Sequence, residues 1–229
     1  MKKKVITLIR HAESENNLFY ESPNNKNILK LTPDPGITQK GIIQAEKLGH
    51  YFKENENSYN FDLIISSPMK RAIESSSIIF NKSNAEKTIW DTVFEAKGPY
   101  SKNDKSCIKR SEFKKKFPEY SLPDTIKEQG WYSKNFSESV YATFNRARRV
   151  LNTLINDQSH NNIAIVSHCI FISIILRILL FKHIFIHFSC KSQLSPPNTS
   201  LSTFIILDKN AYIKELMISP HLENNLIIP

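Results

Sequence analysis

Three short apolar runs, each followed at once by polar residues, limit the folds open to this chain. The runs consist mainly of aliphatic and β-branched residues, which is typical of short buried strands, and they occupy residues 5–9, 61–65 and 163–166. The polar residues that follow them are Arg10-His11, Ser66-Ser67 and Ser167-His168. In open parallel sheets, ligands bind just beyond the carboxyl ends of the strands. The pattern therefore predicts an α/β fold with these residues at one edge, although ordinary polar loops remain the alternative.

Arginine and histidine recur at these predicted strand ends. Arg10 and His11 follow the first run, His168 follows the third, and Arg71 lies in the first turn of a helix expected to start at Ser67-Pro68. An anion is favoured at that end of a helix. Guanidinium forks and imidazoles suit a phosphate group. The alternative for Arg71 is an ordinary surface arginine.

A resemblance to a known family rests on three blocks in order. Arg10-His11-Ala12-Glu13 resembles the Arg-His-Gly-Glu signature of the histidine phosphatase (phosphoglycerate mutase-like) superfamily, with Ala12 in place of glycine. Residues 66–72 resemble its second signature, and Ser167-His168 its third. The resemblance implies one domain over residues 1–229, with a three-layer α/β/α architecture and a mostly parallel sheet. Alanine fits at position 12 only if its φ is negative.

The resemblance also implies roles for the residues at the site. His11 is expected to be the nucleophile, forming a phosphohistidine, while Arg10, Arg71 and His168 surround the phosphoryl oxygens. Residues 89–95 are predicted to form a short strand ending at Glu95, the expected general acid; the alternative is an exposed glutamate.

Asn17 stands in register with a phosphate-contacting asparagine of the superfamily. A loop asparagine is otherwise a turn residue, and residues 16–30 are predicted to be a loop.

The segment of residues 97–136 shows no clear period and is predicted to be a lid over the pocket. It carries basic and aromatic residues, and Arg110 is a candidate substrate contact; nucleic-acid binding is the alternative for such a mixture. Residues 107–110 and Phe117-Pro118 also resemble the fungal and plant branch of phosphoglycerate mutase-like proteins.

Other elements follow from periodicity and capping. Thr38 is a plausible N-cap for an amphipathic helix that continues to Phe52. Residues 137–157 are predicted to be a helix with Arg146 facing mostly outward, and strands are expected at residues 198–207 and 212–218.

Net charge, cysteine count and the longest apolar run indicate which partners and which compartment the chain suits. The 229 residues carry a formal charge of +9, which favours anionic partners, and three cysteines, an odd number that suits a reducing compartment. The run of residues 169–181 is interrupted by Arg177 and is too short for a membrane span. The charge fits a phosphorylated small molecule, nucleic acid or an acidic membrane surface equally well. With the resemblance, we expect a cytoplasmic protein that binds a small phosphorylated molecule, without membrane or nucleic-acid partners. Whether it is a monomer or a homodimer stays open.

The predicted function is hydrolysis of a small phosphorylated metabolite, with no cofactor and no metal. His183 and His187 are four residues apart but lack a His-Glu-x-x-His motif. The first alternative is a cofactor-dependent phosphoglycerate mutase, which would need 2,3-bisphosphoglycerate. Such mutases carry a His-Tyr-Gly stretch after the general acid, and residues 96–100 lack it. The second alternative is a catalytically silent phosphate-binding or interaction protein.

Overall fold

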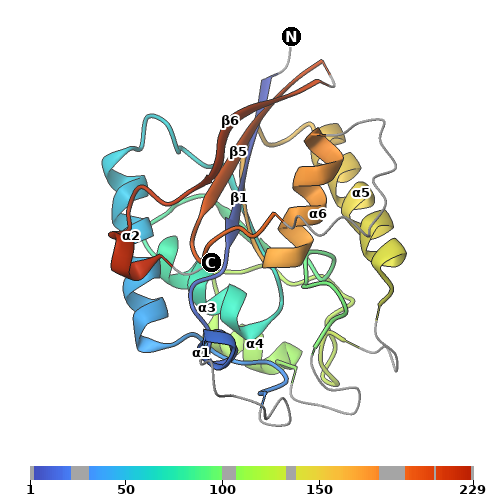
Figure 1. Ribbon diagram of the computed structural model, residues 1–229. Coiled ribbons are helices and arrows are strands. Elements are labelled where there is room, and N and C mark those ends of the chain that lie inside the picture. The colour runs from blue at the N-terminus through green and yellow to red at the C-terminus, as the bar shows by residue number, and fades with distance from the viewer. Residues whose placement is uncertain are drawn as a thin grey trace.

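A six-stranded sheet in the order β3-β2-β4-β1-β5-β6 runs through the middle of the protein (Figure 1). The computed structural model describes residues 3–21, 31–99, 107–132, 138–180, 194–208 and 210–227. The strands are β1 (Lys3–Arg10), β2 (Leu63–Ser66), β3 (Glu86–Ile89), β4 (Asn162–Ser167), β5 (Leu201–Leu207) and β6 (Asn210–Ile218). β1 to β4 are mutually parallel, whereas β5 pairs antiparallel with β1 and β6 antiparallel with β5.

The register of the parallel strands brings their carboxyl ends to one edge. Arg10 at the end of β1 lies opposite Ser167 at the end of β4, and Ser66 at the end of β2 lies opposite Val166. The residues that follow these positions therefore emerge side by side, as the three apolar runs predict.

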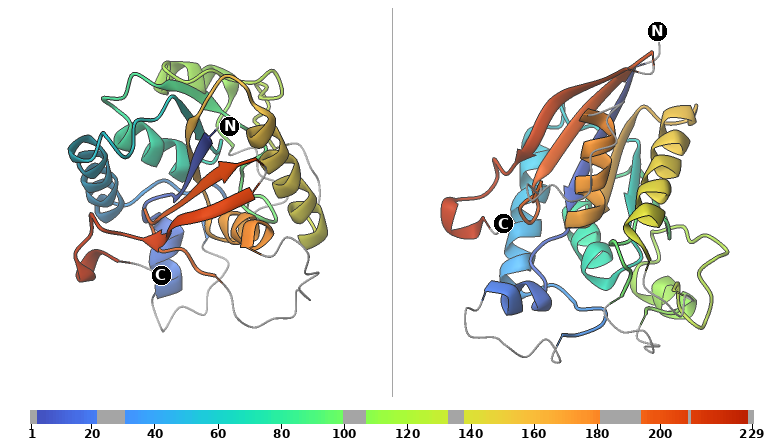
Figure 2. Two further views of the ribbon diagram at one scale, coloured as in Figure 1. Left: turned by 90° about the horizontal axis from the view of Figure 1, so that it is seen from above. Right: turned by 45° about the vertical axis from the view of Figure 1, so that its right-hand side comes forward.

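Helices cover both faces of the sheet, so the three-layer α/β/α prediction is confirmed (Figures 1 and 2). They are α1 (Glu15–Glu21), α2 (Gln39–Glu54), α3 (Lys70–Ile79), α4 (Arg110–Lys116), α5 (Val140–Asn156) and α6 (Cys169–Leu180), with a 3-10 turn η2 (Asn224–Leu226). Within those ranges, no helix has the length and apolarity needed to pass through a bilayer.

Strand side chains alternate between two hydrophobic clusters, because successive residues point to opposite faces of a sheet. Leu63, Ile65 and Ile163 pack with residues of α5 and α6. Ile64 and Ala164, each next in sequence to one of these residues, pack instead with residues of α2 and α3. The sheet is therefore buried on both sides at its centre, as continuous apolar strands require.

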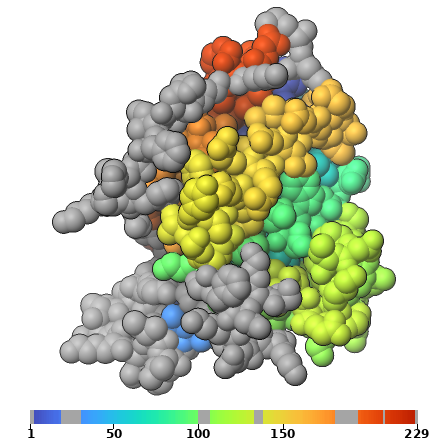
Figure 3. Space-filling view, turned by 90° about the vertical axis from the view of Figure 1, so that its right-hand side faces the viewer, coloured from blue at the N-terminus to red at the C-terminus, as the bar shows by residue number. Residues whose placement is uncertain are grey.

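Residues 107–132 are folded onto one side of this framework, contrary to the expectation of a segment without regular structure. Phe113 of α4 is fully buried and packs in a third cluster with Met69, Ile73 of α3 and Ile89 of β3. Figure 3 shows this segment (yellow-green) beside α5 (yellow), with green residues near position 90 between them. The flanking residues 100–106 and 133–137 lie outside the described ranges, so the lid itself stays a prediction.

Two expected segments near the site differ from the structure. Residues 15–21 form α1 instead of a loop, because the backbone turns at once after Ser14, where the Asn17 N–H bonds to the Ser14 carbonyl; residues 22–30 lie outside the described part. The strand expected at 89–95 is instead β3 at Glu86–Ile89. It ends there because its partner β2 ends at Ser66, which pairs with Ile89.

Candidate active site

His11 lies immediately after β1 and is held in one tautomer. Its Nδ1 is 2.7 Å from the Ala12 carbonyl oxygen, which can only accept, so Nδ1 carries the proton. Its Nε2 therefore has a free lone pair, which accepts a hydrogen bond of 3.1 Å from Arg71 Nε. The side chain is buried, with 4% of the residue exposed. This arrangement presents an unprotonated nitrogen to the Arg71 guanidinium.

Two guanidinium groups surround this imidazole. Arg71 comes from the first turn of α3 and is 3% exposed, so it is not an ordinary surface arginine. Its Nη1 is buried without a hydrogen-bond partner among the described residues. Arg10 is also buried, and its Nη1 donates to the Pro196 carbonyl over 2.7 Å. Buried polar atoms are normally paired, so the unpaired Arg71 nitrogen indicates a site for an anion.

His168 completes the cluster from the end of β4. Its ring centroid lies 5.1 Å from that of His11, and the residue is fully buried. Its Nε2 is 2.7 Å from Ser67 Oγ, while its Nδ1 has no hydrogen-bond partner in the described part of the chain. Ser67 was expected to be the N-cap of α3. The cap is Met69, two residues later, and the Ser67 hydroxyl accepts from the Met69 N–H over 3.3 Å as well as contacting His168.

Both histidines are held neutral. Burial lowers the pKa of His11 well below its usual 6.5, and the charges of Arg71 and Arg10 lower it further. Burial also lowers the pKa of His168, with added contributions from Arg71 and His11. A neutral imidazole with a free lone pair can act as a nucleophile or a hydrogen-bond acceptor at neutral pH.

Ala12 is accommodated without backbone strain. It does not have a positive φ, which was the condition for alanine at this position. Its N–H donates to Ser75 Oγ of α3 over 2.9 Å, and its methyl group is fully buried. Behind it, the Asn198 side chain donates to the His11 carbonyl over 2.8 Å. Sequence reasoning missed Ser75 and Asn198, because no local pattern marks either residue.

The loop after Ala12 is locked against the start of α2. Thr38 is the N-cap, as predicted, and its hydroxyl accepts from the Gly41 N–H. The same hydroxyl donates to Glu13 Oε1 over 2.5 Å. A Cβ on Gly41 would lie 2.3 Å from the Glu13 carbonyl oxygen, so only glycine allows this approach.

Glu95 lies beside the start of α6, the helix that follows His168. Its carboxylate accepts hydrogen bonds from the N–H groups of Ile170 and Phe171, two and three residues after His168, and from Ala96. A carboxylate is favoured there because the first N–H groups of a helix lack intrahelical partners. The structure thus places Glu95 at the same edge of the sheet as His168.

Arg146 corrects one prediction. It was expected to face mostly outward from α5, but its side chain is 4% exposed and forms a buried ion pair with Glu138. The helical period alone did not identify this position as buried, because a charged residue is rarely buried unless it is paired.

Asn17 and Arg110 make contacts within their own segments. Asn17 Oδ1 accepts from both the N–H and the hydroxyl of Ser14 over 2.9 Å. Arg110 donates to the carbonyls of Pro123 and Ile126. For both residues the structure therefore shows local anchoring, and substrate contact stays a prediction.

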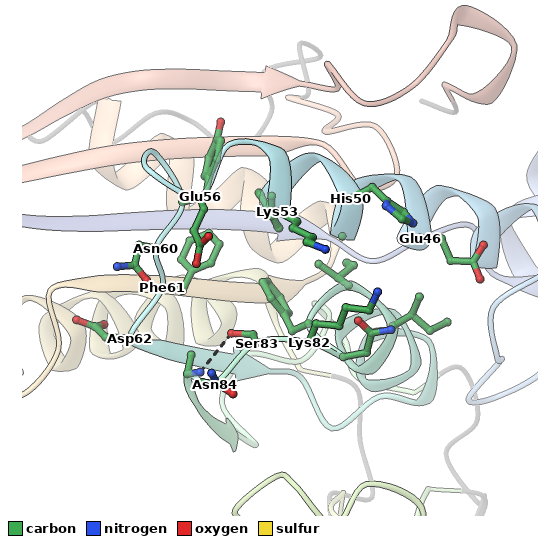
Figure 4. A pocket seen from close by; sticks show the side chains of 18 of the residues that line it. Glu46, His50, Lys53, Glu56, Asn60, Phe61, Asp62, Lys82, Ser83 and Asn84 are labelled. Carbon is green, nitrogen blue, oxygen red and sulfur yellow. Dashed lines mark hydrogen bonds between the residues drawn. The ribbon is translucent and has the colours of Figure 1, made fainter.

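A pocket of about 720 Å³ lies elsewhere, between the C-terminal parts of α2 and α3 (Figure 4). Asp62 and Glu86, at the starts of β2 and β3, line it together with Lys53 and Lys82. It therefore opens at the amino ends of the strands, and none of the predicted site residues lines it.

The described residues contain no group of three or more His, Cys, Asp or Glu side chains that could hold a metal ion; His183 and His187 lie outside them.

Four side chains from three strand ends thus form one buried, positively charged cluster suited to a phosphoryl group. Residues 6–218 match the family model of the histidine phosphatase superfamily (branch 1). The chain belongs to the histidine phosphatase superfamily.

Among curated proteins, the chain resembles two 2,3-bisphosphoglycerate-dependent phosphoglycerate mutases. It is 32% identical to one from Bacteroides thetaiotaomicron over 83 residues, which is 36% of this chain and 30% of that protein. It is 34% identical to one from Bacteroides fragilis over 79 residues, which is 34% of this chain and 28% of that protein. The matched part therefore spans less than a third of each mutase.

Solved structures share the fold over nearly the whole chain. A mutant of phosphoserine phosphatase from Entamoeba histolytica, crystallised in complex with phosphoserine, is 23% identical with a TM-score of 0.59, covering 97% of this chain and 100% of that one. Ecdysone phosphate phosphatase from Bombix mori, in complex with tungstate, is 16% identical with a TM-score of 0.66, covering 96% and 95%. At these identities the likeness shows the fold alone.

Proposed function

We propose that the protein hydrolyses a small phosphate monoester through a phosphohistidine on His11. The observation that carries this proposal is the buried cluster itself: His11 Nε2 is unprotonated and accepts a hydrogen bond only from Arg71 Nε, while Arg71 Nη1 and His168 Nδ1 are buried without partners among the described residues. A phosphoryl group in this space would satisfy both and balance the two guanidinium charges. The family membership and the phosphatase structures of the same fold support it.

In the proposed reaction, His11 Nε2 attacks phosphorus in line while Arg71 turns its fork to the phosphoryl oxygens. The bond from phosphorus to the leaving oxygen breaks, and Glu95 supplies the proton that this oxygen takes up. Glu95 then accepts a proton from water, whose oxygen attacks phosphorus and releases phosphate from His11. Arg10, Arg71 and His168 stabilise the phosphoryl oxygens throughout, and neither a metal nor a cofactor takes part.

A phosphoglycerate mutase is the second candidate, because the curated relatives bear that name. In that case His11 would receive its phosphoryl group from 2,3-bisphosphoglycerate. Against it stands the stretch after Glu95, Ala96-Lys97-Gly98, which lacks the His-Tyr-Gly of such mutases. The resemblance to the fungal and plant branch stays a prediction, as does a catalytically silent phosphate-binding role.

The surroundings in the cell are also proposed. The odd number of cysteines, with Cys107 and Cys169 free, fits a reducing compartment, so we place the protein in the cytoplasm. The positive net charge suits an anionic small molecule, and we expect no nucleic-acid partner.

One experiment distinguishes the candidates. Phosphate release from p-nitrophenyl phosphate, and isomerisation of 3-phosphoglycerate with 2,3-bisphosphoglycerate present, are measured for the wild type, His11→Ala and the control His50→Ala, an exposed histidine of α2. We expect hydrolysis that falls by at least about 1,000-fold in His11→Ala and is unchanged in His50→Ala. A quenched reaction should carry one phosphoryl group on the peptide containing His11.

The other outcomes assign the alternatives. Isomerisation that exceeds hydrolysis in the wild type supports the mutase. Phosphate binding by the wild type without either activity supports the silent protein, and hydrolysis that survives His11→Ala contradicts the phosphohistidine.

A further inference from the structure

The backbone that leads into Glu95 is held by side chains at three successive carbonyl groups. Arg146 Nη1 donates to the carbonyls of Thr92 and Phe94, each over 2.9 Å. Between them, Ser167 Oγ donates to the Val93 carbonyl over 2.7 Å. These residues follow β3 and lie outside any strand, so no backbone ladder fixes them. The Arg146 and Ser167 side chains therefore bind the carbonyl groups that a neighbouring strand would bind in a sheet.

The guanidinium group of Arg146 is itself held by a carboxylate and by two aromatic rings. Its Nε and Nη2 donate to the two oxygens of Glu138 over 3.0 and 2.6 Å, a bidentate pair in which both side chains are buried. The flat faces of its guanidinium lie against Phe94, with 3.7 Å to the ring centroid, and Phe171, with 4.4 Å. Such a planar group with fixed donors cannot be replaced by the single ammonium of lysine.

The same arginine contacts both segments that surround Glu95: the residues that precede it and the first turn of α6. Phe94 directly precedes Glu95, and Phe171 is the α6 residue whose N–H donates to Glu95 Oε1. The charge of Arg146 also contributes to lowering the pKa of His168, after burial and the charges of Arg71 and His11. One buried guanidinium thus contacts the segment before the carboxylate and the helix that binds it.

We propose that Arg146 is a positioning residue, which holds Glu95 at the start of α6 so that its carboxyl group can protonate the leaving oxygen of the substrate. This inference rests on the proposed function, because it needs Glu95 as the general acid. It assigns to Arg146 no contact with the substrate. Its effect should therefore depend on how much the leaving group needs a proton.

The test compares two esters. p-Nitrophenolate leaves readily without a proton, whereas the alkoxide of an alkyl ester such as phosphoserine needs one. We expect Arg146→Met to lower kcat/KM for the alkyl ester on the order of 100-fold, which is a typical contribution of general acid catalysis, and to lower it much less for p-nitrophenyl phosphate. Glu95→Gln should show the same pattern, and Arg146→Lys should resemble Arg146→Met.

Two further variants keep the test decisive. Because removing one partner of a buried pair destabilises a protein, the double variant Arg146→Met with Glu138→Met removes both charges and fills the space with apolar side chains; it carries the test if the single variant does not fold. Arg149→Met, an exposed arginine of the same helix, is the matched control and should leave both rates unchanged.

The outcomes are distinguishable. A larger loss for the alkyl ester in the folded Arg146 variants supports the inference. An equal loss for both esters, or no loss for either, overturns it and leaves Arg146 a purely structural residue. A wild-type chain that hydrolyses neither ester overturns the proposed function instead, and the inference with it.

Discussion

His11 is neutral because its side chain is buried away from water and lies near two positively charged guanidinium groups. Burial, together with Arg71 and Arg10, lowers its pKa, and the Ala12 carbonyl fixes the proton on Nδ1. The same charges that disfavour a protonated histidine attract a phosphate dianion. Once bound, that dianion would raise the pKa of His168 and favour its donating a hydrogen bond to a phosphoryl oxygen. Substrate binding therefore changes the charge of the site, even without a change in fold.

Asp34 provides a pH-dependent prediction at the residue scale. Burial raises its pKa to about 6, although Arg71 and the N–H of Lys70 oppose this. Between about pH 4 and pH 6 the folded chain keeps a proton that the unfolded chain has lost, so Asp34 lowers the stability as pH rises through that window. Replacing Asp34 by asparagine should therefore change stability little below pH 4 and raise it by about 3 kcal/mol above pH 6.

The measurement is urea unfolding of the wild type and Asp34→Asn from pH 3.5 to 7.5. Asp124→Asn, a fully exposed aspartate side chain, serves as the control and should show little pH-dependent difference. A stability difference for Asp34→Asn that does not change with pH would contradict the expected protonation of Asp34.

At the element scale, the site is built where strands end and helices begin. β1, β2 and β4 deliver Arg10, Ser67 and His168 to one edge, and the first turn of α3 adds Arg71. The positive end of α6 binds Glu95, as expected for a carboxylate near unpaired N–H groups. Short elements with well-defined ends therefore place the chemistry, and the 107–132 segment packs against residues of α3 and β3.

That packing predicts the behaviour of Phe113→Ala. Phe113 is fully buried in the cluster that includes α3 and β3 residues, so its loss should destabilise the protein by about 3–5 kcal/mol. The change should affect one cooperative unfolding transition, because the segment shares its core with the main fold. Urea unfolding followed by circular dichroism and by Trp131 fluorescence, in a Trp90→Phe background, measures this.

The matched control is Lys114→Ala, an exposed neighbour in α4, which should change stability by less than about 0.5 kcal/mol. If Trp131 fluorescence reports unfolding at lower urea than circular dichroism does, the segment is an independently unfolding unit and the shared core is not cooperative.

At the scale of the whole molecule, α2 joins the loop after β1 to the turn η2 near the end of the described chain. Gln44 of α2 is fully buried and bonds to both: its Oε1 accepts from the Glu13 N–H, and its Nε2 donates to the Leu226 carbonyl, each over 2.8 Å. Lys47 and Glu223 form an exposed ion pair beside it. α2 thus connects the loop after His11 to η2, the last turn in the described part of the chain.

Gln44→Leu should therefore destabilise the whole fold. Two backbone groups would lose their partners, which costs about 1–3 kcal/mol for each group left buried and unsatisfied. Differential scanning calorimetry of the variant, with the exposed Gln39→Leu of the same helix as control, measures the loss. Equal melting temperatures for Gln44→Leu and the control would show that neither hydrogen bond of the Gln44 side chain contributes to stability.

Local patterns predicted the elements of the site better than their contacts. The apolar runs identified β1, β2 and β4, and the Thr38 cap identified the start of α2. The boundary of β3 was missed because it is set by the length of its partner β2. The burial of Arg146 was missed because its partner Glu138 and its aromatic neighbours come from three different segments.

The sequence by itself determined the class of fold and the four polar side chains that meet at the strand ends. Strand periodicity, helix starts and the order of the signatures are local properties of the chain, and they need no knowledge of packing. Only the tertiary structure decided the tautomer of His11, the pairing of His168 with Ser67 and the anchoring of the backbone before Glu95 by Arg146. These depend on which buried donor finds which acceptor across segments far apart in sequence, and that is fixed when the layers pack.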